Sequence, residues 1–203
     1  MITLCIDKKE DIIIPFTTIG DSLWEENTRL IIASLADNWG NDLANPKSER
    51  EIQELEARIG TNLPNSLKEF YKVFGVADIG EKLISFDEID YIGKIWEPHP
   101  EYGPRFSEKD LMVLPYLVTF SDYLGNGNMF CFHKETKEIY YFDHDSQPYF
   151  TKMFDHFDDY LKGCLIFAQA DLFGEVGQDK VDQWTEEIVE ELIGTDLLRK
   201  WRY

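Results

Sequence analysis

The chain has 203 residues, of which 43% are hydrophobic, and it carries 39 acidic against 20 basic residues for a net charge of −19. This length and apolar content suit one domain with a sizeable core and argue against a disordered chain. A strongly negative surface repels phosphate backbones and anionic lipid heads, so direct binding to nucleic acid or membranes is disfavoured. A basic protein partner is favoured instead, with solubility alone as the plainer reason for the acidity.

Three cysteines, Cys5, Cys131 and Cys164, lie far apart among apolar neighbours. Their odd number and wide spacing predict buried thiols in a reducing compartment rather than a disulfide framework. The N-terminal segment lacks a basic stretch followed by a long apolar run, and no stretch of the sequence reaches the length of a membrane span. We therefore expect a cytoplasmic protein.

The first part of the chain combines two β-rich runs with one helical pattern. Residues 2–6 and 12–16 flank a polar turn, which predicts a β-hairpin. Apolar residues at helical spacing over residues 21–39 predict an amphipathic helix, with Asp21 or Ser22 as its N-cap and Gly40 as its end. The Asn- and Pro-containing residues 41–47 are interpreted as a linker.

Two further helices are predicted to form a helical hairpin. Ser48 and Glu51 have the spacing of a capping box, and the helix that they begin is expected to end at Gly60. The second helix starts after Pro64, because proline tolerates a first helical turn, and it ends at Gly75. A short strand over residues 82–86 and a short helix over residues 87–92 follow.

The centre of the chain is rich in β-branched and aromatic residues. Three apolar runs, residues 113–120, 129–133 and 139–142, are separated by polar connections and predict an antiparallel meander. The preceding loop, residues 95–107, contains three prolines, and its Trp96 and Tyr102 either fix the loop to the sheet or line a pocket. We expect a core sheet with polar groups gathered at the strand ends.

The C-terminal part is predicted to be helical. Aromatic and aliphatic residues recur at spacings of three and four within residues 150–173, which predicts one long helix. Residues 171–191 carry eight acids and one lysine, and an apolar stripe indicates a folded helix rather than a loose acidic tail. That stripe consists of Val181, Trp184, Ile188 and Leu192. Gly194 is expected to separate it from a last helical turn over residues 197–201.

Asp143, His144 and Asp145 form the densest ionisable cluster next to apolar sequence. Two carboxylates beside an imidazole could bind a metal or act as a general base. Successive side chains of an extended chain point to opposite sides, so the three cannot converge on one ion. A turn whose aspartates accept hydrogen bonds from backbone amides is the better interpretation.

The other motifs for chemistry are incomplete. Cys131 and His133 share one face of a strand, but no second pair with zinc-ligand spacing occurs. Residues 125–128 (GNGN) lack the lysine of a phosphate loop, and they suit a strand connection with positive φ. The sequence contains neither a nucleophile elbow nor a zinc-protease helix. We expect no metal and no other cofactor, and the prior for an enzyme is low.

Several segments together resemble one known family. The pattern Glu56…Leu63-Pro64…Phe70 lies in the helical hairpin, LISFDEIDYI follows it, and the meander adds GNGNMFCF and IYYFDHD, whose strand ends in Asp143, before the helix FDDYLKG. Their order and spacing are similar to the SUKH superfamily, which includes bacterial immunity proteins of toxin systems and a fungal cell-wall assembly regulator. The resemblance covers residues 48–163.

The resemblance implies an α+β fold with a central, mostly antiparallel sheet and flanking helices, in a SUKH-like single domain (residues 1–203) with a helical C-terminal extension. Residues 48–163 would form the SUKH-like core, residues 1–47 an N-terminal hairpin and helix, and residues 164–203 an acidic helical extension. The resemblance also implies no enzyme activity and, in bacteria, the neutralising of a cognate secreted toxin, often a nuclease. A basic nuclease would suit the negative charge.

The leading hypothesis is an immunity protein that binds a basic toxin through the polar rim of the sheet. The candidate contact residues belong to the rim, to two aromatic anchors and to the C-terminal acids: Asp122, Asn126, Asn128, Asp143, His144, Asp145, Trp96, Tyr102, Glu186, Glu187, Glu190 and Glu191. The alternatives are a non-enzymatic adaptor similar to the fungal regulator and a hydrolase that uses residues 143–145. For each residue alone, a turn former or a solvated acid is the plainer interpretation.

Overall fold

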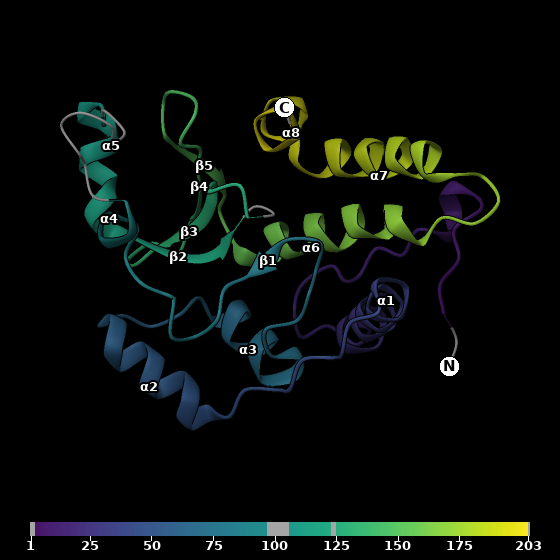
Figure 1. Ribbon diagram of the computed structural model, residues 1–203, viewed down its shortest axis with the longest axis horizontal. Coiled ribbons are helices and arrows are strands. Elements are labelled where there is room, and N and C mark those ends of the chain that lie inside the picture. The colour runs from purple at the N-terminus through teal and green to yellow at the C-terminus, as the bar shows by residue number, and fades with distance from the viewer. Residues whose placement is uncertain (1–2, 97–105, 123–124, 203) are drawn as a thin grey trace. The chain divides into compact units, whose positions relative to one another are not determined.

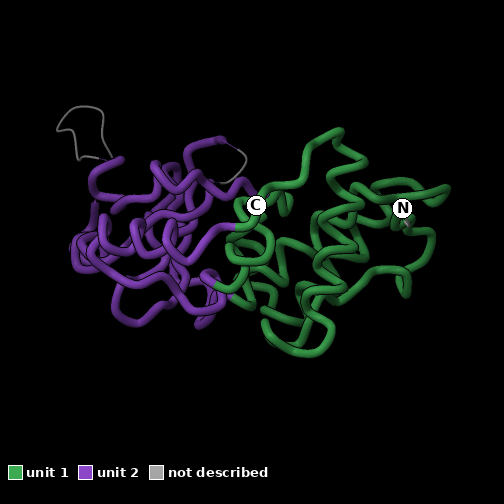
Figure 2. Tube along the Cα trace, turned by 90° about the horizontal axis from the view of Figure 1, so that it is seen from below, with its two compact units in different colours: residues 1–46, 69–80, 158–203 green, residues 47–68, 81–157 purple. Residues whose placement is uncertain are grey.

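A computed structural model describes residues 3–96, 106–122 and 125–202, and the chain divides into two compact units (Figure 2). Unit 1 comprises residues 1–46, 69–80 and 158–203, and unit 2 comprises residues 47–68 and 81–157. The chain crosses between the units after residues 46, 68, 80 and 157. Each unit is therefore assembled from segments that lie far apart in the sequence.

Unit 2 contains a five-stranded antiparallel sheet whose strands follow chain order (Figure 1). The strands are β1 (Lys82–Leu83), β2 (Leu117–Asp122), β3 (Met129–His133), β4 (Ile139–Phe142) and β5 (Phe150–Phe154). One row across the sheet pairs Thr119 with Cys131 and Cys131 with Tyr140. The predicted meander is confirmed, and with it the α+β class.

Both faces of the sheet are apolar. Side chains alternate between the two faces, and successive residues of the central strands are apolar. One face carries a cluster of buried residues: Ile92, Leu117, Cys131, Phe142 and Phe150. On the opposite face the ring centroids of Phe130 and Tyr141 lie 4.8 Å apart, and those of Phe120 and Phe132 lie 6.4 Å apart. Strands buried on both sides explain why their sequences are nearly continuous apolar runs rather than alternating ones.

Two helices of unit 2 begin at serine caps. In α2 (Glu49–Ile59) the Ser48 hydroxyl accepts from the Glu51 amide (3.3 Å), and the Glu51 carboxylate accepts from the Ser48 amide (2.8 Å), so the predicted capping box is confirmed. α2 ends at Gly60, whose φ of 68° is left-handed. α3 (Asn65–Phe74) follows, and two short helices, α4 (Ile92–Ile95) and α5 (Glu108–Val113), precede β2.

Unit 1 contains most of the remaining helices: α1 (Trp24–Trp39), α6 (Phe157–Ala168), α7 (Gln178–Ile193) and α8 (Thr195–Arg202). A Cβ on Gly163 in α6 would lie 2.7 Å from the Trp201 ring, which is 2% exposed. This close approach explains a glycine inside a helix, where it costs about 1 kcal/mol relative to alanine. Among the described residues, no helix is long and apolar enough to cross a membrane.

The predicted N-terminal hairpin is wrong. Residues 9–11 form a 3₁₀ turn (Lys9–Asp11), and Ile6 pairs as an isolated parallel bridge with Phe173. The buried Gln169 side chain accepts from the Ile13 amide (2.8 Å) and donates to the Ile13 carbonyl (2.9 Å). Because this side chain satisfies the backbone groups that a hairpin would pair, the extended segment needs no second strand.

Two predicted strands and one predicted helix also differ from the structure. Residues 113–116 belong to the end of α5 and to a 3₁₀ turn (Leu114–Tyr116), so β2 starts only at Leu117. A capping box between Ser107 and Asp110 begins α5, and Pro115 cannot donate to a sheet ladder. The predicted strand over residues 82–86 is limited to β1, and residues 86–88 form a turn where a helix was predicted from residue 87 on.

The predicted helix over residues 150–173 begins too early. Residues 150–154 pair with β4 as β5, and α6 starts at Phe157 and gives way to a 3₁₀ turn (Gln169–Leu172). Phe150 and Phe154 satisfy both helical and strand periodicity, and the free edge of β4 decides between them. On α7 the buried positions are Val181, Thr185 and Val189, whereas Leu192 is 47% exposed.

The cysteine prediction holds for two of the three thiols. Cys131 and Cys164 are buried, whereas Cys5 is exposed. Burial raises the pKa of the Cys131 thiol. All three are free cysteines, and Cys5 lies beside the Asp7 carboxylate at 3.8 Å rather than in an apolar environment.

Candidate functional site

The connection between β2 and β3 forms the first part of the polar rim. The Asp122 carboxylate accepts a hydrogen bond from the Gly125 amide (3.2 Å), and the Asn126 side-chain oxygen accepts from the Asn128 amide (2.8 Å). Gly125 and Gly127 have φ values of 76° and 94°, as the GNGN pattern predicts. The rim side chains therefore form the connection itself, and Asn126 remains exposed to solvent.

Asn128 is the centre of the rim and is 8% exposed. Its Oδ1 accepts from the His144 amide at 3.0 Å and lies 2.7 Å from His144 Nδ1, while its Nδ2 donates to the Tyr141 hydroxyl at 3.0 Å. Because Oδ1 is an acceptor, His144 Nδ1 carries the proton. In the neutral ring, Nε2 then has a free lone pair, and it lies 3.4 Å from Asp145 Oδ1.

The His144 ring stacks on Trp96, with centroids 5.3 Å apart and an interplanar angle of 23°. Trp96 also contacts Phe142 of β4 at 5.3 Å, so the indole links the rim to the apolar face of the sheet. A Cβ on Gly127 would lie 3.4 Å from both His144 and Trp96, which makes glycine the fitting residue there. Tertiary packing alone brings Trp96 to the rim, as no sequence spacing links it to residues 126–145.

Asp143 and Asp145 form the predicted turn. The Asp143 carboxylate accepts from the Asp145 amide (3.0 Å) and from the Ser146 hydroxyl. The Asp145 side chain is 79% exposed, and that of His144 is 25% exposed. In the part of the chain that the structure describes, no three His, Cys, Asp or Glu side chains are grouped to hold a metal ion. The described side chains of the rim thus form a polar surface whose turns are closed by side-chain hydrogen bonds.

Not every candidate residue lies at the rim. Tyr102 is outside the described residues. The four C-terminal glutamates belong to α7 in unit 1, whereas the rim belongs to unit 2. Three of these glutamates have partners within unit 1: Glu186 pairs with Arg202 (3.6 Å), Glu187 pairs with Lys9 (2.8 Å) and Glu190 accepts from the Thr195 hydroxyl (2.6 Å). The hydrogen bond from Lys9 lowers the pKa of Glu187. Glu191 is exposed.

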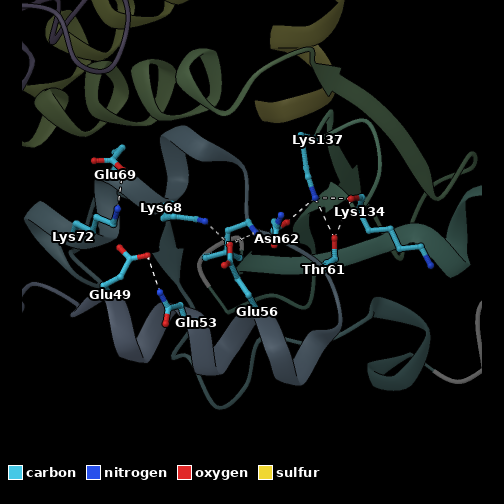
Figure 3. Close-up of polar contacts among 11 residues, drawn as sticks. Glu49, Gln53, Glu56, Thr61, Asn62, Lys68, Glu69, Lys72, Lys134 and Lys137 are labelled. Carbon is cyan, nitrogen blue, oxygen red and sulfur yellow. Dashed lines mark hydrogen bonds and ion pairs between the residues drawn. The ribbon is translucent and has the colours of Figure 1, made fainter.

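A second polar cluster, the α2–α3 junction, contains Glu56 of α2 and Lys68 of α3 (Figure 3). The Glu56 carboxylate on α2 accepts from the Leu63 amide at 2.8 Å and pairs with Lys68 Nζ of α3 at 2.8 Å. The Glu56 and Lys68 side chains are only 13% and 19% exposed. The pattern Glu56…Leu63-Pro64 therefore contains the carboxylate and the amide whose hydrogen bond fixes the turn between the two helices.

Lys137 joins this junction to the β3–β4 hairpin (Figure 3). Its ammonium donates to the Asn62 carbonyl (2.6 Å), the Lys134 carbonyl (2.5 Å) and the Thr61 hydroxyl (3.1 Å). Burial lowers the pKa of Lys137. Its φ of 65° is unusual for a residue with a side chain, and the three hydrogen bonds hold it there.

No curated protein is similar enough to the chain to count as a match. The sequence profile of the SMI1 / KNR4 family (SUKH-1) matches residues 46–163, which is more than half of the 203 residues. The matched range includes the α2–α3 junction, the whole sheet and the rim, and it agrees with the resemblance over residues 48–163. The chain therefore belongs to the SMI1 / KNR4 family (SUKH-1).

Proposed function

We propose that this chain is an immunity protein that binds and neutralises a cognate bacterial toxin. The observation that carries the proposal is its membership of a family in which such immunity proteins occur. Members of this family are generally non-catalytic and act by binding other proteins. Neutralisation needs no catalysis, because an inhibitor that covers the active cleft of a toxin, or a surface beside it, blocks access of the substrate.

The charge of the chain supports a basic toxin as the partner. A net charge of −19 creates a potential that speeds association with a cationic protein and repels nucleic acid. Toxins that cut nucleic acid present basic surfaces to the phosphate backbone of their substrate. A basic, nuclease-type toxin is thus the partner whose charge is complementary to this chain.

The rim is the proposed contact surface. Its backbone is fixed by side-chain hydrogen bonds, so little conformational freedom would be lost on binding. Asn126 and Asp145 are exposed and would contact the partner directly, while the buried Asn128 would hold His144 in place. Trp96 and Tyr102 would serve as aromatic anchors, and the glutamates of α7 would mainly raise the association rate.

Co-expression tests the proposal. The gene next to the one for this chain is expressed with and without it, and growth is followed. If the neighbouring product is toxic, the wild-type chain restores growth. A neighbour that is harmless alone contradicts the assignment as an immunity protein.

A matched pair of variants then tests the rim. In D145R the exposed carboxylate of the rim becomes a cation, and rescue should weaken because like charges face a basic toxin. The control, E54R, makes the same charge change on α2, where Glu54 is 61% exposed and pairs with Arg50. Equal rescue by both variants would place the contact surface elsewhere.

The second candidate is a non-enzymatic adaptor similar to the fungal cell-wall assembly regulator, because the same family includes that protein. It predicts no toxin gene beside this one and a host protein as the partner. Purification of the tagged chain from its own organism, followed by identification of a stoichiometric partner, distinguishes a toxin from a host protein.

A further inference from the structure

Unit 2 carries a group of half-buried side chains outside the rim, here called the tyrosine patch, made of four rings and one lysine: Tyr91, Tyr116, His133, Tyr140 and Lys134. The His133 ring stacks on Tyr116, with centroids 5.1 Å apart and an angle of 11°, and it lies 6.3 Å from Tyr140. Lys134 Nζ lies 4.9 Å from the centre of the Tyr116 ring and 5.5 Å from that of Tyr91. One ammonium group is thus held against two aromatic rings.

The backbone of Lys134 is fixed on both sides. Its amide donates to the Tyr116 carbonyl (2.8 Å), and its carbonyl accepts from the Thr61 hydroxyl (3.0 Å) and from Lys137 Nζ (2.5 Å). The Lys134 side chain leads away from this network (Figure 3). The patch therefore presents its cation from a preorganised position, which lowers the entropy cost of binding a ligand.

The patch offers a surplus of hydrogen-bond donors. His133 Nδ1 accepts from the Glu135 and Thr136 amides (3.3 and 3.2 Å), so the proton of the neutral ring is on Nε2, which is a donor. Within the described ranges, no hydrogen bond satisfies the hydroxyl of Tyr91, Tyr116 or Tyr140. A ligand with acceptor oxygens matches this set of groups.

Lys134 differs from Lys94 and Lys152 of the same unit in having no acidic partner in the described part of the chain. Lys94 pairs with Asp90 at 2.8 Å, and Lys152 pairs with Glu138 at 2.6 Å. Lys134 Nζ has no carboxylate within ion-pair distance among the described residues, although the chain contains 39 acids. Its charge is accordingly available to an anion from another molecule.

We propose that the tyrosine patch is a docking site for a protein segment that presents a carboxylate side chain next to apolar residues. The carboxylate would contact the Lys134 ammonium, and the rings of Tyr116 and His133 would pack against the apolar neighbours, as tyrosine does in interface hot spots. A single carboxylate needs only this local cation, whereas a nucleic acid would meet the net charge of −19. The site is separate from the rim and does not depend on the toxin proposal.

Two matched peptides test the site on the full-length chain. Acetyl-Leu-Glu-Phe-amide and its glutamine counterpart are titrated into isotope-labelled protein, and amide and tyrosine-ring shifts are followed by NMR. The glutamate peptide should shift Tyr116, His133 and Lys134, and it should bind about fivefold more tightly than the glutamine peptide. Added salt should reduce that difference.

Variants assign the contact to Lys134. K134M should reduce the affinity for the glutamate peptide about fivefold and leave that for the glutamine peptide unchanged. K94M is the control, because Lys94 also lies over the Tyr91 ring (5.7 Å) but is already paired with Asp90. An unchanged amide spectrum elsewhere shows that each variant is folded. Absence of binding by both peptides, equal binding of the two, or unchanged affinity in K134M overturns the proposal.

Discussion

The α2–α3 junction and the rim are both polar clusters of unit 2, but their side chains do different things. At the junction, charged groups with little exposure, Glu56 and Lys68, pair with each other and with the backbone of the turn. At the rim, the neutral Asn128 amide orients His144 and leaves Asp145 exposed. The junction thus stabilises the fold, while the exposed rim is the surface that we propose for the partner.

The largest expected effect is at the junction. Glu56→Ala removes the partner of Lys68 and leaves the Leu63 amide without an acceptor, so we expect a loss of about 2–3 kcal/mol in the free energy of unfolding. Urea denaturation measures it. Glu54→Ala on the same helix is the control, and it should cost less than about 0.5 kcal/mol because the Glu54–Arg50 pair is exposed. Equal losses would mean that the junction does not stabilise the turn.

At the rim, Asn128→Ala is expected to cost about 1–2 kcal/mol, because His144 and Tyr141 lose their hydrogen-bond partner in a buried place. The Nδ1 proton of His144 should then exchange faster with water, which NMR of the imidazole detects. Asn126→Ala removes one exposed hydrogen bond and should cost about 0.5 kcal/mol. A larger loss for Asn126 than for Asn128 would contradict the central role of Asn128.

The capping box of α2 gives a smaller, pH-dependent effect. Hydrogen bonds from the Ser48 amide and hydroxyl lower the pKa of Glu51 from an ordinary 4.5 to about 2. A carboxyl with a lowered folded-state pKa stabilises the fold fully above pH 4.5, and this stabilisation is lost as the pH falls toward 2. The stability difference between wild type and Glu51→Gln, measured by urea denaturation, should therefore shrink over this interval. Ser48→Ala should cost about 1 kcal/mol at neutral pH. A difference that stays constant with pH would argue against the capping box as its source.

The smallest effect on stability is expected for Asp145→Asn, because this side chain is 79% exposed and its nearest ring nitrogen, His144 Nε2, lies 3.4 Å away. The free energy of unfolding should change by less than about 0.5 kcal/mol. Association with the toxin should nevertheless slow, and stopped-flow measurement at two salt concentrations would show it. An unchanged rate would remove Asp145 from the contact surface.

Local sequence signals predicted much of the scaffold. The Ser48 capping box, the left-handed glycines Gly40 and Gly60, and the strands over residues 129–133 and 139–142 all follow from neighbours in the chain. The turn at Asp143 was predictable for the same reason, because an aspartate accepts hydrogen bonds from amides two residues on. These features need no information about distant residues.

The site could be predicted only in part. The polar residues at the strand ends were identifiable, but the burial of Asn128, the stacking of Trp96 on His144 and the role of Gly127 were not. Each depends on a partner that is distant in the sequence. Asn128 and His144, for example, are separated by sixteen positions. A pattern of single residues contains no signal for such contacts.

The sequence by itself determined where α2 begins and ends, which runs form the strands β3 and β4, and the sign of the net charge, because caps, glycines and charges act locally or by simple addition. Only the tertiary structure decided that residues 150–154 are a strand, that residues 12–16 are not, and that Asn128 is buried. For residues 150–154 and residues 12–16, two local conformations were compatible with the residues. The choice between them came from backbone hydrogen bonds, such as those of the β4 edge and of Gln169, whose partners lie elsewhere in the chain.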